Sequence, residues 1–221
     1  MAKPRAKARP AQPATKRPSP AAKAKTARPG LSPHLFLNPL GNFSNGSSSF
    51  SFGVLRPQFN GRQNTAEEFG RLKLHPVNAP APGQKFSPTC RFDVLLPTPA
   101  PDEWLDPQRL LAAFDSSALK WKNGILAYAT FRFERAPRLH SMFEEVRRFA
   151  AERLLPRQVA VIIMQHAPHL VGSRNLPHCH LLVPIREITA FSGGFGAYDE
   201  LLMRDEAQQL IWDNWLEFSR P

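Results

Sequence analysis

The sequence is short of several features that mark whole classes of protein. It has two cysteines, Cys90 and Cys179, and no secretory signal, which argues against a disulfide scaffold and favours a reducing, cytoplasmic compartment. No run of about 18 apolar residues is present, so we expect no membrane span. Tyrosine is scarce, because Tyr128 and Tyr198 are the only two among 221 residues. Chemistry that needs a phenolic nucleophile therefore has few candidates.

Acidic residues are missing from the first 30 positions, which carry nine basic residues. The formal net charge is +11, yet the rest of the chain holds 20 basic and 18 acidic residues and is nearly neutral. Residues 1–33 also lack aromatic side chains and contain seven prolines, which oppose the amphipathic helix of a transit peptide. We predict a disordered basic arm, whose natural partner is nucleic acid or another anionic surface. Its candidate DNA-contacting residues are Lys3, Arg5, Lys7, Arg9, Lys16 and Arg17.

The remainder divides into a linker and a body. A Ser-, Gly- and Asn-rich composition predicts a linker over residues 34–54, and residues 55–221 are enough to bury one core. Hydrophobic periodicity predicts strands at 91–96, 125–133, 158–165 and 180–188, and helices at 107–114, 138–155 and 199–218. The strand at 158–165 is followed by a short connection and another strand, which indicates an antiparallel hairpin. We predict an α+β domain with a mainly antiparallel central sheet and flanking helices.

Histidines are concentrated around this hairpin. His178 and His180 are two residues apart at the start of a strand, so both side chains point to the same face. His166 ends the preceding strand, and antiparallel pairing would bring it beside them. Three converging imidazoles can bind a divalent metal and leave positions open for water or a phosphate oxygen. Because neutral imidazole is the ligand form, we expect binding to weaken below about pH 6.

The spacing also resembles a known family. His178-Cys179-His180 matches the HUH pattern of nicking enzymes, in which a usually hydrophobic residue separates two histidines. The segment VAVIIMQHAPHLVGSRNLPHCHLLVPIREI resembles the MobA/MobL relaxases of plasmid mobilisation, and the turn Gly194-Phe195-Gly196 follows as it does there. Upstream, VLLPTPAPDEWLDPQRLLAAF resembles the Pro-Ala-Pro-x-x-Trp region of that family. The resemblance covers residues 55–218 and is most specific over 139–217.

The resemblance implies a function and a set of partners. In the family, three histidines hold Mg²⁺ or Mn²⁺, the ion polarises a phosphate of single-stranded DNA, and a tyrosine attacks it. His166, His178 and His180 would be the metal ligands here, and an all-imidazole site would also accept Zn²⁺. Single-stranded or nicked DNA is the expected partner, other mobilisation proteins are further candidates, and no membrane is expected. Arg174 and Arg186 flank the histidines and are candidate phosphate contacts.

The nucleophile departs from the family pattern. The family's tyrosine lies in an N-terminal helix, and GRQNTAEEFGR at residues 61–71 resembles that helix with Gly70 in the tyrosine's place and Phe69 beside it. Tyr128 lies in an apolar strand and is predicted to be a core residue, which leaves Tyr198 as the candidate nucleophile. Three hypotheses stay open: a nicking enzyme, a relaxase derivative that binds metal and DNA without nicking, and a DNA-associated adaptor that depends on the basic arm.

Overall fold

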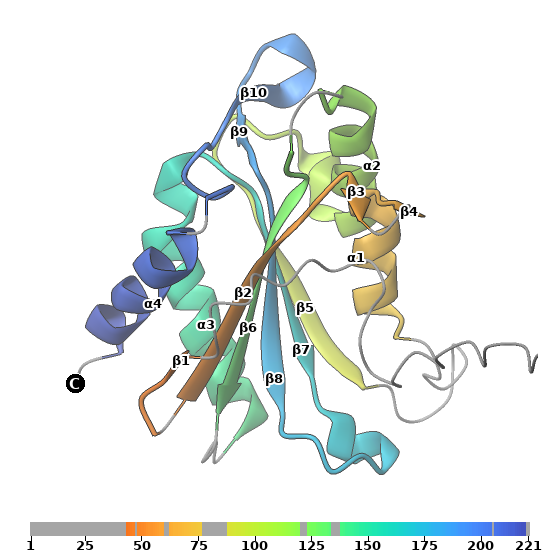
Figure 1. Cartoon of the computed structure of the whole chain (residues 1–221). Coiled ribbons are helices and arrows are strands. Elements are labelled where there is room, and N and C mark those ends of the chain that lie inside the picture. The colour runs from red at the N-terminus through yellow and green to blue at the C-terminus, as the bar shows by residue number, and fades with distance from the viewer. Residues whose placement is uncertain are drawn as a thin grey trace, which may run out of the picture. The chain divides into compact units, whose positions relative to one another are not determined.

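The computed structural model describes residues 43–46, 48–59, 62–76, 88–119, 123–133, 138–204 and 206–219. The predicted basic arm and residues 34–42 and 47 of the predicted linker lie outside these residues. The described residues form the α+β fold that the sequence predicts, with a six-stranded antiparallel sheet at its centre (Figure 1). In spatial order the strands are β1 (Phe43–Ser44), β2 (Ser48–Leu55), β6 (Leu126–Phe133), β8 (His178–Pro184), β7 (Val161–His166) and β5 (Thr89–Leu95).

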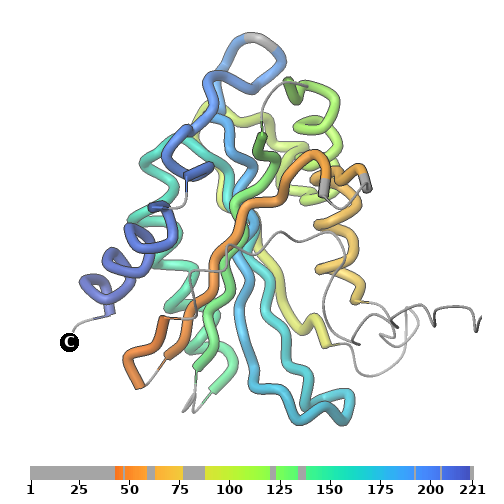
Figure 2. Tube along the Cα trace, viewed as in Figure 1, coloured from red at the N-terminus to blue at the C-terminus, as the bar shows by residue number. Residues whose placement is uncertain are grey.

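Helices cover both faces of this sheet, as the cartoon and the tube drawing of the chain show (Figures 1 and 2). The helices α1 (Ala66–Leu74) and α2 (Pro107–Ser117) lie on one side, and α3 (Leu139–Arg153) and α4 (Ala207–Phe218) lie on the other. Two short ribbons complete the fold, β3 (Gln58–Phe59) with β4 (Arg62–Gln63), and β9 (Arg186–Ile188) with β10 (Phe195–Tyr198). Single 3₁₀ turns occupy η1 (Asp102–Leu105), η2 (Leu155–Arg157), η3 (Pro168–Val171) and η4 (Ser192–Gly194).

The two faces of the sheet can be told apart at the end of β7. The Gln165 side chain donates to the carbonyl of Leu139 in α3, whereas the next residue, His166, contacts the carbonyl of Lys73 in α1. Successive side chains of a strand point to opposite faces, so the odd–even alternation decides which helix each residue meets. The histidine cluster therefore belongs to the face that α1 covers.

Strand β2 is the main departure from the predicted organisation. Phe50 and Phe52 are buried, and all eight residues of β2 pair with β6 in continuous antiparallel register. The predicted boundary between linker and body, at residue 54, thus falls inside a core strand. The Ser- and Gly-rich composition indicated a loop, but Ser48, Phe50 and Phe52 supply a buried face, and the half-buried Ser49 and Ser51 alternate with them.

One further expectation needs adjustment. The last helix begins at Ala207 rather than near 199, because Asp199 accepts hydrogen bonds from the backbone N–H groups of Leu201 and Leu202 and so forms a turn. Pro184 ends β8, which lies between β6 and β7 in the sheet. Asp106 caps α2, whose first residue is Pro107. Within the described residues, no helix is long and apolar enough to cross a membrane.

Gly70 in α1 faces α2 at very short range. A Cβ placed on Gly70 would lie 2.2 Å from Cδ1 of Leu111, a fully buried side chain. Replacing glycine by alanine inside a solvent-exposed helix stabilises a protein by about 1 kcal/mol, whereas overpacking a core destabilises it by about 1–3 kcal/mol. We expect Gly70→Ala to lower the free energy of unfolding by up to about 2 kcal/mol, measured by urea denaturation. Glu67→Ala, an exposed change in the same helix, should shift it by less than about 0.5 kcal/mol; stabilisation by Gly70→Ala would contradict the close packing.

Candidate metal centre

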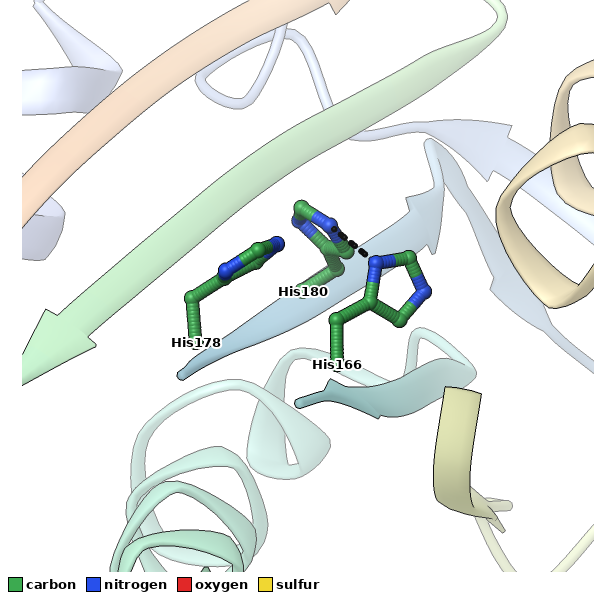
Figure 3. Close-up of side chains that lie close together, drawn as sticks. All are labelled: His166, His178 and His180. Atoms are coloured by element: carbon green, nitrogen blue, oxygen red, sulfur yellow. Dashed lines mark hydrogen bonds between the residues drawn. The ribbon is translucent and has the colours of Figure 1, made fainter. Parts of the chain in front are cut away.

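The three predicted histidines meet at the end of the β7–β8 hairpin (Figure 3). His166 pairs with His178 across the hairpin, and His180 follows two residues later on the same face. Their ring centroids are 4.5 Å apart for His166 and His180, 4.7 Å for His178 and His180, and 5.3 Å for His166 and His178. Each ring offers one nitrogen to a group whose members all lie within 4.8 Å of one another. The described residues place no carboxylate or thiol in this group.

The nitrogens that face away from the group are held by neighbouring atoms. His166 Nε2 lies 2.8 Å from the carbonyl oxygen of Lys73, and His178 Nδ1 lies 2.9 Å from that of Leu176. A carbonyl can only accept, so these two nitrogens carry the protons, and His166 Nδ1 and His178 Nε2 keep their lone pairs. Metal-binding histidines in proteins are oriented by this kind of outer hydrogen bond.

His180 is held by two hydroxyl groups. Its Nδ1 lies 2.7 Å from the Tyr128 hydroxyl and 3.0 Å from that of Thr130, and its Nε2 lies 3.2 Å from His166 Nδ1. Since His166 Nδ1 is unprotonated, His180 Nε2–H donates to it, and the Tyr128 hydroxyl donates to His180 Nδ1. A hydroxyl group can also accept a hydrogen bond. The same two hydroxyls can therefore accept from a protonated Nδ1 of His180, which leaves its Nε2 unprotonated and available as a metal ligand.

All three imidazoles are neutral in the folded chain at pH 7. Burial is the largest cause in each case: it lowers the pKa of His166 to about 4, assisted by the nearby His178. Burial likewise lowers the pKa of His178, with Arg132 and Lys73 adding to the effect. The pKa of His180 is lowered well below its usual value, again by burial first and then by His166 and Lys73. Neutral imidazole is the form that binds a metal, so the folded chain presents ready ligands.

The donor set fits a divalent ion. Two ligands of one ion bound at about 2.1 Å lie roughly 3.0–3.4 Å apart, and His166 Nδ1 and His180 Nε2 are already 3.2 Å apart. His178 is the partly exposed member of the group, so a small rotation of its side chain would complete the set. The cluster could therefore hold a metal ion, and three ligands would leave coordination positions for water or an oxygen of a bound molecule.

Two cations lie beside this cluster. Lys73 Nζ is 4.7 Å from the centre of the Tyr128 ring, and Arg132 is paired in register with His178. Both lower the pKa values of His178 and His180, so both act on the cluster electrostatically. A divalent ion bound by the histidines would add two more positive charges to this environment. The natural ligand of such a site is an anion, and phosphate oxygens suit a hard cation with neighbouring Lys and Arg side chains.

Tyr198, the predicted nucleophile, is not brought to the cluster. It lies on β10 opposite Arg186, which is six residues beyond His180, so the two sites are roughly 20 Å apart along the sheet. The β9–β10 ribbon stands at the opposite end of the sheet from the β7–β8 connection (Figure 2). The Tyr198 hydroxyl accepts a hydrogen bond from the backbone N–H of Leu119 at 2.9 Å. The geometry therefore gives no support to Tyr198 as a nucleophile at the histidines.

The predicted phosphate-binding arginines differ in their placement. Arg186 is buried, and its guanidinium donates to the carbonyl oxygens of Gly196, Ser117 and Phe195, so it joins the β9–β10 ribbon to α2. Its donors are thus engaged inside the protein rather than offered to DNA. Arg174 is exposed in the connection that leads into His178, at the cluster's end of the sheet. The arm residues Lys3, Arg5, Lys7, Arg9, Lys16 and Arg17 lie outside the described residues.

Sequence reasoning missed Lys73, Thr130 and Arg132, and assigned Tyr128 to the core without a role. A signal for three of them was present, because Tyr128, Thr130 and Arg132 alternate along one strand and so share a face. Tyr128 is indeed buried, but its hydroxyl is bound to His180. Lys73 had no such signal, since its position depends on how α1 packs against a distant strand.

Comparisons with known proteins define no family for this chain. No protein-family model and no curated protein matches it. A solved structure described as "Molecular Basis of Vancomycin Resistance Transfer in Staphylococcus aureus" aligns with a TM-score of 0.44 and 20% sequence identity. The alignment covers 58% of this chain and 64% of that chain, so less than two thirds of that protein is spanned. A likeness of this extent assigns neither the activity nor the partners of the chain.

Proposed function

We propose that this chain is a relaxase-like protein that binds single-stranded DNA through a divalent metal held by His166, His178 and His180. The proposal rests on three neutral imidazoles that converge beside Lys73 and Arg132. Hydrogen bonds to the ring nitrogens that face away from the cluster hold them in place. When bound, the metal would supply a Lewis acid for a phosphate oxygen. A role in plasmid or mobile-element mobilisation follows only from the resemblance of the hairpin and its flanking segments to the MobA/MobL relaxases.

Each part of the proposed site has a separate task. The histidines hold the metal, and Lys73, Arg132 and the exposed Arg174 attract the phosphate backbone. The basic arm adds salt-dependent attraction that does not depend on base sequence. Mn²⁺ or Zn²⁺ is expected to bind more tightly than Mg²⁺, because Mg²⁺ prefers oxygen ligands and this set is entirely nitrogen.

Of the open hypotheses, we favour the derivative that binds metal and DNA without nicking. Tyr128 is buried, and its hydroxyl lies against Nδ1 of His180, on the other side of the ring from the nitrogen that faces the cluster. Tyr198 is at the far end of the sheet. The chain contains no third tyrosine. We therefore expect DNA to be bound at the metal without formation of a phosphotyrosine bond.

The test is the metal-dependent part of DNA binding by the full chain. Fluorescence anisotropy with a labelled single-stranded oligonucleotide is measured in Mn²⁺ and in EDTA at about 150 mM salt, which weakens the contribution of the arm. We expect Mn²⁺ to raise the affinity by at least about tenfold. His178→Ala should abolish this increase and keep the EDTA-level affinity. An equal affinity of the wild-type protein in Mn²⁺ and EDTA would overturn the proposal.

Two controls make the result specific. His169→Ala removes an exposed histidine from the same connection and should leave the metal effect unchanged. Incubation of the wild-type chain with end-labelled DNA and Mn²⁺, followed by denaturing electrophoresis, should yield no covalent adduct. An adduct that disappears on replacing Tyr128 or Tyr198 by phenylalanine would instead establish the nicking enzyme.

A further inference from the structure

A row of polar side chains crosses the sheet from the histidine cluster to the outer strand β1. Cross-strand pairing places its members directly opposite one another on neighbouring strands, in the order His166, His178, Arg132, Ser49 and Ser44. A second row runs beside it through His180, Thr130 and Ser51. Paired residues of this kind lie on the same face of a sheet, with Cβ atoms about 5 Å apart. Both rows therefore lie on the face that carries the metal centre.

The opposite face of the same strands is apolar. Phe50 of β2 pairs with Phe131 of β6, and both side chains are fully buried. They pack against Trp212 and Trp215 of α4, with ring centroids 5.8 Å and 4.5 Å apart. An antiparallel sheet with one apolar and one polar face leaves the polar face to water or to a ligand.

Helix α1 covers the metal-centre face only beyond the second row. The next pair along β2 and β6 is Gly53 with Tyr128, and both are buried. Phe69 of α1 lies edge-on to the Tyr128 ring, with centroids 5.1 Å apart. The residues before this pair are half-buried or exposed, and they form a polar strip made of Ser44, Ser49, Ser51 and Arg132. From His178 to the end of the strip is three strand spacings, or about 14 Å.

The polar strip offers hydrogen-bond donors, and its one charged residue is positive. Arg132 Nη1 donates to Ser51 Oγ at 3.2 Å, which holds the guanidinium over β2 and β6. Among the described residues no carboxylate forms an ion pair with Arg132. By contrast, ion pairs with a carboxylate are formed by Arg91, Arg147, Arg153 and Arg157. A guanidinium beside several hydroxyl groups suits the successive phosphate oxygens of a nucleic-acid backbone.

We propose that the polar strip binds the sugar–phosphate backbone of the strand held at the metal, and that this strand leaves the metal centre toward β1. The inference rests on the proposed function. Arg132 contacts the phosphate next to the one at the metal, because it lies directly opposite the ligand His178. Ser51 is a positioning residue for the guanidinium, and Ser49 donates to the backbone farther along. The contacts are made with phosphates and sugars, so they do not depend on base sequence.

The experiment measures binding of two fluorescein-labelled probes to the full chain in Mn²⁺ over a range of salt concentrations. The probes are dodecathymidylate and an abasic strand with the same number of phosphates. We expect Arg132→Ala to weaken both by about tenfold. It should also reduce the slope of log affinity against log salt by about 0.7, the value for one phosphate contact of a single strand. Arg132→Lys should restore this slope, because it keeps the charge.

Two further variants make the result specific. Arg148→Ala is the matched control, because it removes an exposed arginine from α3 on the opposite face of the sheet, and it should keep the wild-type slope. Ser51→Ala should weaken both probes by about threefold without changing the slope, since the Arg132 charge remains. Ser51→Thr should restore the affinity, because it keeps a hydroxyl group for Arg132. Thermal melting of each variant checks that the chain is folded.

The outcomes separate this inference from the function on which it rests. If Arg132→Ala keeps the wild-type affinity and slope while the Mn²⁺ effect persists, the strip is overturned and metal-dependent binding stands. If only dodecathymidylate is weakened, Arg132 contacts bases, and the inference is overturned in the same way. Arg132→Ala should bind Zn²⁺ at least as tightly as the wild-type chain, because it removes a positive charge beside His178; weaker Zn²⁺ binding would mean that the loss acts through the metal and would overturn the strip. If the wild-type chain shows no Mn²⁺ effect, the proposed function has failed and the inference falls with it.

Discussion

His180→Ala is expected to weaken binding of Zn²⁺ or Mn²⁺ by at least about 100-fold, measured by isothermal titration calorimetry or by competition with a chelator. His180 is the central member of the cluster, because its ring contacts His166 on one side and the two hydroxyl groups of β6 on the other. Removing the imidazole takes away one of three ligands and also the group that spaces the other two. The remaining pair cannot enclose an ion.

A series of variants with graded losses of metal affinity tests whether the ion is bound by these rings. Tyr128→Phe removes one of two hydroxyl partners of His180 Nδ1 and leaves Thr130 in place, so a smaller loss of about tenfold is expected. His169→Ala, which changes an exposed histidine of the same connection, should bind metal as the wild-type chain does. If His180→Ala also retained the wild-type affinity, the bound ion would have to sit elsewhere in the protein.

The convergence of the histidines was predictable because it depends on two simple periodicities. A spacing of two along a strand puts His178 and His180 on one face, and a hairpin brings the end of one strand beside the start of the next. Both conditions can be read from the order of apolar and polar residues, and the register His166 to His178 confirms them. The antiparallel sheet was predictable for the same reason, since the connection after His166 is too short for a crossover to a parallel neighbour.

Contacts between distant elements were not predictable from these patterns. Lys73 supplies the carbonyl that orients His166, yet 93 residues separate them, and only the packing of α1 on the sheet brings them together. Arg186 looked like a phosphate contact because it follows the histidines, but a bend at Ile185 carries it into the β9–β10 ribbon, where carbonyl oxygens take up its donors. Proximity in sequence predicted proximity in space only within the hairpin itself.

The stability of the metal-free chain is expected to fall as pH is lowered from about 6.5 toward 4. An unfolded histidine binds a proton below about pH 6.5, whereas burial keeps His166 neutral in the folded state until about pH 4. A histidine whose pKa is lower in the folded state than in the unfolded state favours the unfolded chain between the two pKa values. Its contribution to stability is therefore fully present above pH 6.5 and is lost as the pH falls below it. For His166 alone the loss amounts to about 3 kcal/mol. His178 and His180 shift in the same direction and add to it.

The measurement is urea denaturation in EDTA at pH 7, 6 and 5, a range in which the histidines dominate. Burial raises the pKa values of Asp115 and Glu145, so these carboxyl groups contribute with the opposite sign, equally in the wild-type chain and in the variants. His166→Gln removes one titrating ring and keeps an amide donor for the Lys73 carbonyl, so its stability should depend less on pH than that of the wild-type chain. His140→Ala, at an exposed site, should show the wild-type slope. Equal slopes in His166→Gln and the wild-type chain would mean that folding does not lower the pKa of His166.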